Sequence, residues 1–177
     1  MWLWIIAGIV AVLVGGFAWG VVRLRRGQSQ AQEAIASVKI EEIAGLCEEC
    51  VEGFKEHFGE TLDLHAFEES AQTFSARLDN HESLKEPFSI DTFYWRFVLN
   101  TGAFLGEMLR VHAGGEWSYD DDGGAPVMKI TVGEGKVTVF PFDKILKHVQ
   151  IGDPGDMYAF LQTSLKLEEV VAGASET

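Results

Sequence analysis

One uncharged stretch at the start of the chain limits what the rest can fold into. Residues 2–22 carry no charged or amide side chain. As a helix rising about 1.5 Å per residue, such a run is roughly 30 Å long, which matches the hydrocarbon core of a bilayer. Runs of more than about 18 apolar residues are typical of transmembrane helices. We therefore expect this stretch to cross a membrane once and to anchor the remainder of the chain.

The residues around this stretch indicate its orientation. Indole rings favour the headgroup level of a bilayer, and the anchor has three near its ends: Trp2, Trp4 and Trp19. Three cations follow it directly: Arg23, Arg25 and Arg26. Positive flanks stay on the cytoplasmic side. We expect a very short N-terminus outside, with the C-terminal domain in the cytoplasm.

A cleaved secretory signal is the main alternative to an anchor. Small-x-small patterns occur at Gly16-Phe17-Ala18 and Ala18-Trp19-Gly20. A signal peptide, however, has its positive charge before the apolar run, and that run has about 7–15 residues. Here the positive charge follows a longer apolar run, so the pattern favours an uncleaved anchor.

Gly16 and Gly20 also have the GxxxG spacing that is used when transmembrane helices pair.

The remainder of the chain is strongly acidic. The 177 residues include 27 acidic and 14 basic side chains. Without the three flanking arginines, 27 acids face 11 bases, a formal net charge of −16. Phosphate backbones repel such a domain, so the composition disfavours nucleic-acid binding. The charge serves either solubility or docking to a basic partner surface.

Helical periodicity dominates the first part of this remainder. Apolar residues recur at helical spacing from Ala31 to Phe58, and Gly59 is placed to end that helix. Thr61 is a candidate N-cap for a second helix that continues to Asn80. A third helix should begin near Ser89 or Asp91 and run to about His112 as the central core helix. Within it, Gly102 and Gly106 predict close approach of another element.

After Gly114 the apolar pattern changes to a period of two, which predicts three short strands. They cover Glu116 to Tyr119, Val127 to Val132 and Lys136 to Phe140, with turn residues between them. Pro141 should begin a short helix through Val149, and Asp153 with Pro154 a final one. The expected fold class is α+β: an N-terminal transmembrane helix, helices, a three-stranded antiparallel meander and C-terminal helices.

These patterns divide the chain into four parts. We expect an anchor with its basic flank at 1–26 and a hinge with an amphipathic juxtamembrane helix at 27–60. An α+β cytoplasmic domain should occupy 61–171, and a frayed tail 172–177.

The two cysteines form a CxxC pair, Cys47 and Cys50. A redox-active pair needs a helix N-terminus, whereas this pair lies inside the first helix beside Glu48, Glu49 and Glu52, whose charges raise a thiol pKa. We expect reduced thiols on the apolar face. Zinc would need two further ligands, of which His57 could supply one.

No phosphate-binding loop, nucleophile elbow or HExxH motif is present in the sequence. We predict no catalytic residues, metal or cofactor.

Three short motifs follow one another in the second half of the chain. They are Leu105-Gly106-Glu107, Gly114-Gly115-Glu116-Trp117 and Pro141-Phe142-Asp143-Lys144. This order, within residues 101–150, resembles a group of uncharacterised small bacterial α+β domains. Their pattern is a helix with LGE, a GG-x-W strand start and a PF-x-K turn after a hairpin. The resemblance implies a bacterial source and an α+β fold, and it implies no reaction.

The same motifs can be interpreted physically. Gly106 should allow close packing, Trp117 should fill the space between sheet and helix, and Pro141 should turn a strand into a helix. If Glu107 is buried beside Trp117, it needs a partner such as Arg110 or a backbone amide. Glu107 is therefore the first polar side chain to examine for function.

The leading hypothesis is a non-enzymatic, single-pass accessory or adaptor protein of the bacterial cytoplasmic (inner) membrane. Its acidic domain would face a protein partner, including one within a larger membrane complex. One alternative is an immunity-type inhibitor of a basic toxin. Another is a thiol- or metal-dependent enzyme around Cys47, Cys50 and His57. Burial of the thiols distinguishes these classes, because a functional thiol must be reachable.

Overall fold

The computed structural model describes most of the chain after the expected anchor. The described residues are 32–79, 93–121, 124–151 and 157–166. The chain divides into two compact units, Met1–Ala34 and Ile35–Thr177. Only residues 32–34 of the first unit are described, so the fold below is that of the second.

The predicted transmembrane stretch and its flanking arginines lie outside the described residues, as does the tail from residue 172. Among the helices that are described, none is both long and apolar enough to span a bilayer. The expected caps Ser89, Asp91 and Asp153 also lie outside the described residues.

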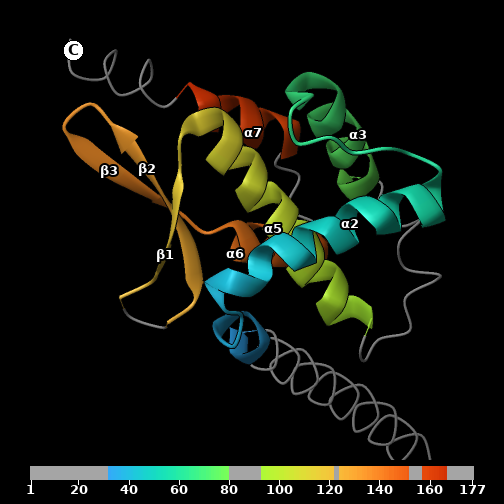
Figure 1. The fold of residues 1–177 in the computed structure, drawn as a ribbon, viewed down its shortest axis with the longest axis horizontal. Helices are drawn as coiled ribbons and strands as arrows, with labels where there is room; N and C mark the ends of the chain where they lie inside the picture. Colours follow the sequence, from blue (N-terminus) through green and yellow to red (C-terminus); the bar gives the residue numbers. More distant parts are fainter. Residues whose placement is uncertain (1–31, 80–92, 122–123, 152–156, 167–177) are drawn as a thin grey trace, which may run out of the picture. The chain divides into compact units, whose positions relative to one another are not determined.

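The described elements form an α+β fold, as the sequence predicts. In chain order they are η1 (Ile40–Glu42), α2 (Ile43–Phe58), α3 (Phe67–Asp79), α5 (Phe93–Ala113), β1 (Glu116–Tyr119), β2 (Pro126–Val132), β3 (Gly135–Val139), α6 (Pro141–Ile151) and α7 (Met157–Leu165). The helices before the sheet and the helices after it all pack around α5 or its neighbours (Figure 1).

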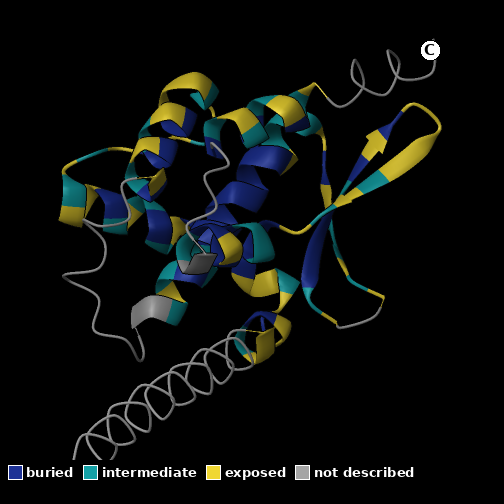
Figure 2. Ribbon diagram, turned by 180° about the vertical axis from the view of Figure 1, so that it is seen from behind, coloured by how far each residue is buried: buried dark blue, intermediate teal, exposed yellow. Residues whose placement is uncertain are grey.

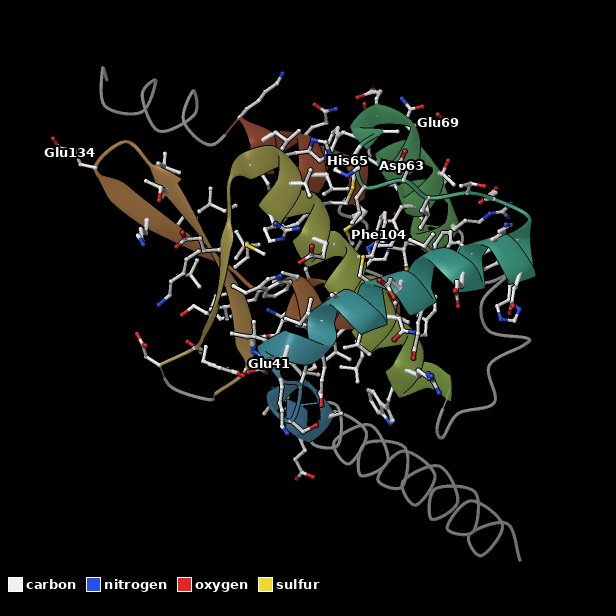
Figure 3. The ribbon with its side chains drawn as sticks, viewed as in Figure 1. Glu41, Asp63, His65, Glu69, Phe104 and Glu134 are labelled. Carbon is white, nitrogen blue, oxygen red and sulfur yellow. The ribbon has the colours of Figure 1, made fainter. Side chains whose placement is uncertain are left out.

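Helix α5 is the core helix, as predicted. It packs against α2, α6, α7 and β2, and every residue from Thr101 to Leu109 is buried. Figure 2 shows this continuous buried segment in the interior, and Figure 3 shows Phe104 among the side chains packed there. Phe104 lies 5.1 Å from Phe74 of α3 between ring centroids. A helical segment buried on all sides suits the sequence, in which five of these nine residues are apolar and two are glycines.

The sheet is an antiparallel meander in the order β1-β2-β3. The predicted strand bounds differ from the observed ones by at most one residue. Met128, Ile130 and Val132 alternate on one face of β2 and are buried, so this face covers the core. Gly133 has φ +57° and opens the two-residue turn to β3, as expected for a type II′ hairpin turn.

The single helix expected from Ala31 to Phe58 is interrupted in the structure. Ser37 to Lys39 are not helical, and η1 precedes the start of α2. The backbone N–H of Lys39 donates to the Glu42 carboxylate (3.2 Å), and the side chain of Val38 is buried. The break in the helix thus places Val38 in the core, and apolar periodicity alone does not predict this break. Gly59 ends α2 in a left-handed conformation (φ +67°), as predicted.

The second helix begins later than predicted, at Phe67, and Thr61 is not its N-cap. Asp63 organises the preceding turn instead. Its carboxylate accepts from the backbone N–H of His65 (2.9 Å), and its own N–H donates to Ser70 Oγ (2.8 Å). The Ser70 hydroxyl also donates to the Asp63 carbonyl oxygen (2.8 Å). These side-chain bonds compete with helix formation before Phe67.

Pro141 begins α6 directly after the sheet, as predicted. Phe142 then packs against α5 at Gly102, where an added Cβ would lie 2.4 Å from the phenyl ring. Helix α7 packs on α3 and α5. The Tyr158 hydroxyl and the Gln162 amide of α7 both donate to the Glu68 carboxylate of α3.

Candidate functional site

Glu107 lies where α5 meets the sheet. A Cβ added at the preceding residue, Gly106, would lie 2.1 Å from the Trp117 indole ring, so only glycine lets β1 approach this closely. The Trp117 indole N–H then donates to Glu107 Oε1 (2.8 Å). Arg110 Nε donates to Glu107 Oε2 (2.9 Å). The predicted partnership of Glu107 with Arg110, beside Trp117, is confirmed.

This cluster holds the sheet on the helix. The Glu107 side chain is 11% exposed, and both of its oxygens accept hydrogen bonds from the chain itself. The hydrogen bond to Glu107 raises the pKa of the Arg110 guanidinium. Because both of its oxygens accept hydrogen bonds, the Glu107 carboxylate stabilises the packing of Trp117. Glu107 could act as a catalytic acid or base only if those hydrogen bonds were broken.

Both cysteines lie on the core face of α2, as predicted, with 4% and 3% of Cys47 and Cys50 exposed. Burial raises the pKa of the Cys47 thiol to about 12, and the negative charges of Glu107 and Glu48 add to the rise. Burial also raises the pKa of the Cys50 thiol well above its ordinary value, with a smaller contribution from Cys47. Both side chains are therefore protonated thiols near neutral pH, and a thiol is a poor nucleophile and metal ligand.

His57 lies on the exposed side of α2, two turns beyond Cys50. The two residues line the same groove between α2 and α5. Within the described residues, no three His, Cys, Asp or Glu side chains come close enough together to hold a metal ion. The structure therefore does not assemble Cys47, Cys50 and His57 into a ligand set in the part of the chain it describes.

The groove between α2 and α5 has a volume of about 230 Å³. Its apolar wall comes from Phe54, Phe58 and Phe97, and its acidic rim from Glu49, Glu52 and Glu56. Gly53 also lines it, and an added Cβ there would meet nothing within 4 Å. This open space lies in the middle of an acidic rim.

Arg96 and Asn100 of α5 hold one member of the rim. Arg96 donates through Nε and Nη2 to the two oxygens of Glu49 (3.0 and 2.8 Å), and the Asn100 amide donates to Oε2 (3.1 Å). The bonds from Arg96 lower the pKa of Glu49, and the Asn100 bond adds to that effect. Asn100 Oδ1 is buried and has no hydrogen-bond partner among the described residues. A donor entering the groove could satisfy it.

The outward face of α2 is an acidic stripe, which we define as Glu48, Glu52 and Glu56. All three are exposed, and their spacing of four residues aligns them along the helix. Glu41 lies exposed in η1, just before α2, and Glu69 lies exposed on α3; both are labelled in Figure 3. Each arginine within the described ranges already pairs with a glutamate of the chain: Arg77 with Glu60, Arg96 with Glu49 and Arg110 with Glu107.

Sequence reasoning identified the glutamate-rich side of this helix but not the groove beside it. The groove depends on which helix packs against α2, and that helix lies about 50 residues further along the chain. The signal that could have found it is the combination of an acidic stripe with Gly45 and Gly53, two glycines in a helix interior. Comparison of the chain with protein-family models, curated proteins and solved structures finds no match.

Proposed function

We propose that this chain is a non-enzymatic, membrane-anchored adaptor. Residues 2–22 anchor it in the bacterial cytoplasmic membrane, and residues 23–26 remain at the cytoplasmic surface. The acidic domain then presents α2 and its groove to a basic segment of a partner protein.

The outward face of α2 carries this proposal. Like charges four residues apart destabilise a helix by about 0.2–0.5 kcal/mol per pair, and the acidic stripe contains two such pairs. Glycine inside a helix costs about 1 kcal/mol relative to alanine. Gly45 and Gly53 both have open space where a side chain would be. Both the repulsion between the glutamates and the glycines lower the stability of α2, and the described residues leave this face of the helix uncovered. A docked basic partner would explain both, because it would neutralise the glutamates and fill the space beside the glycines.

The groove suits a lysine or arginine side chain of the partner. The aliphatic part of such a side chain can lie along the phenyl rings of Phe54, Phe58 and Phe97, which line the groove. Its charged end then reaches Glu52 and Glu56 at the rim. Absence of a Cβ at Gly53 leaves room for this approach.

The charge of the domain also fits an anchored protein that binds another protein. Anionic lipid headgroups attract the arginines of residues 23–26 and repel a domain of net charge −16. Such a domain stays off the lipid surface, which leaves α2 accessible.

The burial of Cys47 and Cys50 supports an adaptor over a thiol-dependent enzyme. Both thiols have raised pKa values, whereas thiol catalysis requires a reachable thiolate.

The proposed docking is tested by charge reversal on the full-length protein, extracted in detergent and affinity-purified with its co-eluting chains. The variant Glu48→Lys/Glu52→Lys/Glu56→Lys reverses the acidic stripe. The control Glu116→Lys/Asp121→Lys/Glu134→Lys changes the net charge equally at exposed positions elsewhere. We expect a stoichiometric partner that dissociates at high salt, is lost from the stripe variant and is retained by the control. Equal retention or equal loss by both variants would contradict the docking site.

The anchor is tested separately. Deletion of residues 1–26 should move the protein from carbonate-washed membranes to the soluble fraction, while partner capture through α2 continues. A deletion variant that remains in the washed membranes would show that residues 2–22 are not the anchor.

A further inference from the structure

A second groove lies on another part of the domain, beside the last strand of the sheet. It has a volume of about 600 Å³. Its lining residues come from β3 with Phe140 after it, from α6, and from α7 with Phe160. One wall of this groove is therefore a strand at the edge of the sheet.

The edge of β3 offers backbone hydrogen-bonding groups at known positions. In a hairpin closed by a two-residue turn, the residues flanking the turn exchange both hydrogen bonds, and such pairs alternate along the ladder. The register pairs Val132 with Gly135 and Ile130 with Val137, so these are hydrogen-bonded pairs. The N–H and C=O groups of Lys136 and Thr138 consequently point away from β2. An additional strand could bind to them.

The other edge of the sheet differs. The backbone N–H of Ile40, in η1, donates to the Tyr119 hydroxyl at the end of β1 (3.2 Å). The chain before α2 therefore contacts the side chain of the last residue of β1. The described residues place no comparable contact on the outer edge of β3.

The face of β3 toward the groove is apolar. Val137 and Val139 are half-buried and lie opposite the buried Ile130 and Met128, so they belong to the core-facing side of the sheet. Phe140, the residue after the strand, also lines the groove and is 42% exposed. Every second side chain of a strand added to β3 would lie on this same side. Those side chains would enter the groove next to Val137 and Val139.

The charged side chains that line the groove are mainly positive, whereas the domain as a whole is negative. Two lysines and one aspartate line it, in a domain of net charge −16. Lys147 is exposed, and Lys144 Nζ lies 5.3 Å from the centroid of the Phe160 ring. A ligand that fills this groove should carry carboxylates beside its apolar side chains.

We propose that the edge of β3 and this groove bind an extended segment of a second partner protein, whose groove-facing side chains, at every second residue, are in turn apolar and acidic. The segment adds a fourth strand to the sheet through Lys136 and Thr138. Its apolar side chains contact Val137, Val139 and Phe160, and its carboxylates lie near Lys144 and Lys147. This site is independent of the proposed docking on α2, which selects a basic partner.

Substitutions at Thr138 separate strand addition from other binding modes. Thr138→Pro removes the outward N–H while leaving the ladder bonds to β2 in place. Thr138→Val keeps that N–H and changes only the side chain. The probe is a fluorescent ten-residue peptide in which every second residue is in turn valine and glutamate and the other residues are threonine, so that both valine and glutamate face the groove. The control peptide has lysine in place of each glutamate. Fluorescence anisotropy with the full chain in detergent micelles gives the affinities.

We expect the glutamate peptide to bind the parent chain and the lysine peptide not to bind. Thr138→Pro should weaken binding about fivefold or more, because one hydrogen bond to the peptide is lost and the proline ring displaces the adjacent peptide residues. Thr138→Val should stay within about twofold of the parent. Lys144→Glu/Lys147→Glu should weaken binding of the glutamate peptide, and more so at low salt. Equal binding of both peptides, or unchanged affinity in Thr138→Pro, would overturn the proposal.

Amide hydrogen exchange on the parent chain keeps the test decisive if Thr138→Pro does not fold. Peptide binding should protect the amides of Lys136 and Thr138 and leave that of Val137 unchanged, because Val137 already bonds to β2. Absence of this pattern would exclude strand addition.

Two other occupants of the edge would also overturn the proposal. One is a second copy of the chain, revealed by a dimer that Thr138→Pro dissociates. The other is the C-terminal segment, revealed if truncation after Lys166 raises peptide affinity about tenfold or more.

Discussion

Helices α5 and α2 each carry two glycines in their interiors, and these glycines have opposite surroundings. In α5, a Cβ at Gly102 would meet Phe142 at 2.4 Å and one at Gly106 would meet Trp117 at 2.1 Å. In α2, a Cβ at Gly45 or Gly53 would meet nothing within 4 Å. The glycines of α5 are explained by contacts inside the domain, whereas those of α2 are not.

The difference separates two uses of the same residue. In α5, each lost Cβ allows a large ring to approach the helix, and the packing gained offsets the poor helix propensity. In α2, the domain gains no such contact, and the neighbouring glutamates add repulsion. A surface that lowers helix stability without internal benefit is the surface where a partner should be sought.

The largest effect is expected from Gly106→Ala. The added methyl group must displace the Trp117 ring, which also breaks the indole bond to Glu107. We expect a loss of about 3 kcal/mol in the free energy of unfolding, measured by chemical denaturation of the full chain in detergent with circular dichroism. Adding Trp117→Leu to Gly106→Ala should restore part of the loss, because the smaller side chain relieves the clash. If Gly106→Ala leaves stability unchanged, close packing does not explain the glycine.

The next largest effect concerns the carboxylate that this packing positions. Glu107→Ala leaves the Trp117 indole N–H and the Arg110 guanidinium without their acceptor. We expect a loss of about 2 kcal/mol in stability, and a smaller loss for Glu107→Gln, which keeps an acceptor for the indole. Tryptophan fluorescence should report a changed environment of Trp117 in the alanine variant. Equal losses in the two variants would show that the indole bond contributes little.

The glycines of α2 should respond in the opposite direction. Gly45→Ala and Gly53→Ala fill open space with a better helix former, so each should stabilise the domain by about 0.5–1 kcal/mol. The same denaturation measurement applies. We also expect Gly53→Ala to weaken capture of a basic partner, because its methyl group lies in the groove. Stabilisation without any effect on capture would contradict the role of Gly53 as an approach site.

Much of the C-terminal half of the fold could be predicted because its signals are local. The period-two runs and the Gly133-Glu134 turn define the meander within one residue, and Pro141 marks the start of α6. The pairing of Glu107 with Arg110 was also predictable, since a carboxylate buried beside Trp117 requires a hydrogen-bond donor. The bond from the Trp117 indole to Glu107 was not predicted. These inferences need only neighbouring residues and simple geometry.

Other features depend on contacts between distant segments. The apolar period continues through Val38, so the sequence indicates one helix where the structure has a break. The start of α3 is set by the bonds between Asp63 and Ser70, which compete with the N-cap expected at Thr61. The groove beside α2 requires knowing that Arg96 and Asn100 of α5 meet Glu49. Periodicity defines which face of a helix is buried, but not which helix covers it.

The smallest predicted effect tests this contact between the two helices. The hydrogen bonds from Arg96 lower the pKa of Glu49, so the folded state binds the proton of this carboxyl less readily than the unfolded state does. The contribution of Glu49 to stability is therefore present above the ordinary carboxyl pKa of about 4.3. It is lost as the pH falls from there through the lowered pKa of the folded state.

We expect Glu49→Gln to be less stable than the parent at pH 7, and we expect the two stabilities to converge as the pH falls below about 4. The effect should be small, because the Glu49 and Arg96 side chains are 41% and 66% exposed and water screens their pairing. Denaturation at a series of pH values measures it, with Glu52→Gln as the control, since that change removes a carboxylate from the same helix without touching Arg96. Parallel pH profiles for the parent and Glu49→Gln would mean that this ion pair does not help to join α2 to α5. The contact between α2 and α5 would then depend on apolar packing and the Asn100 hydrogen bond, and acid would not weaken it through Glu49.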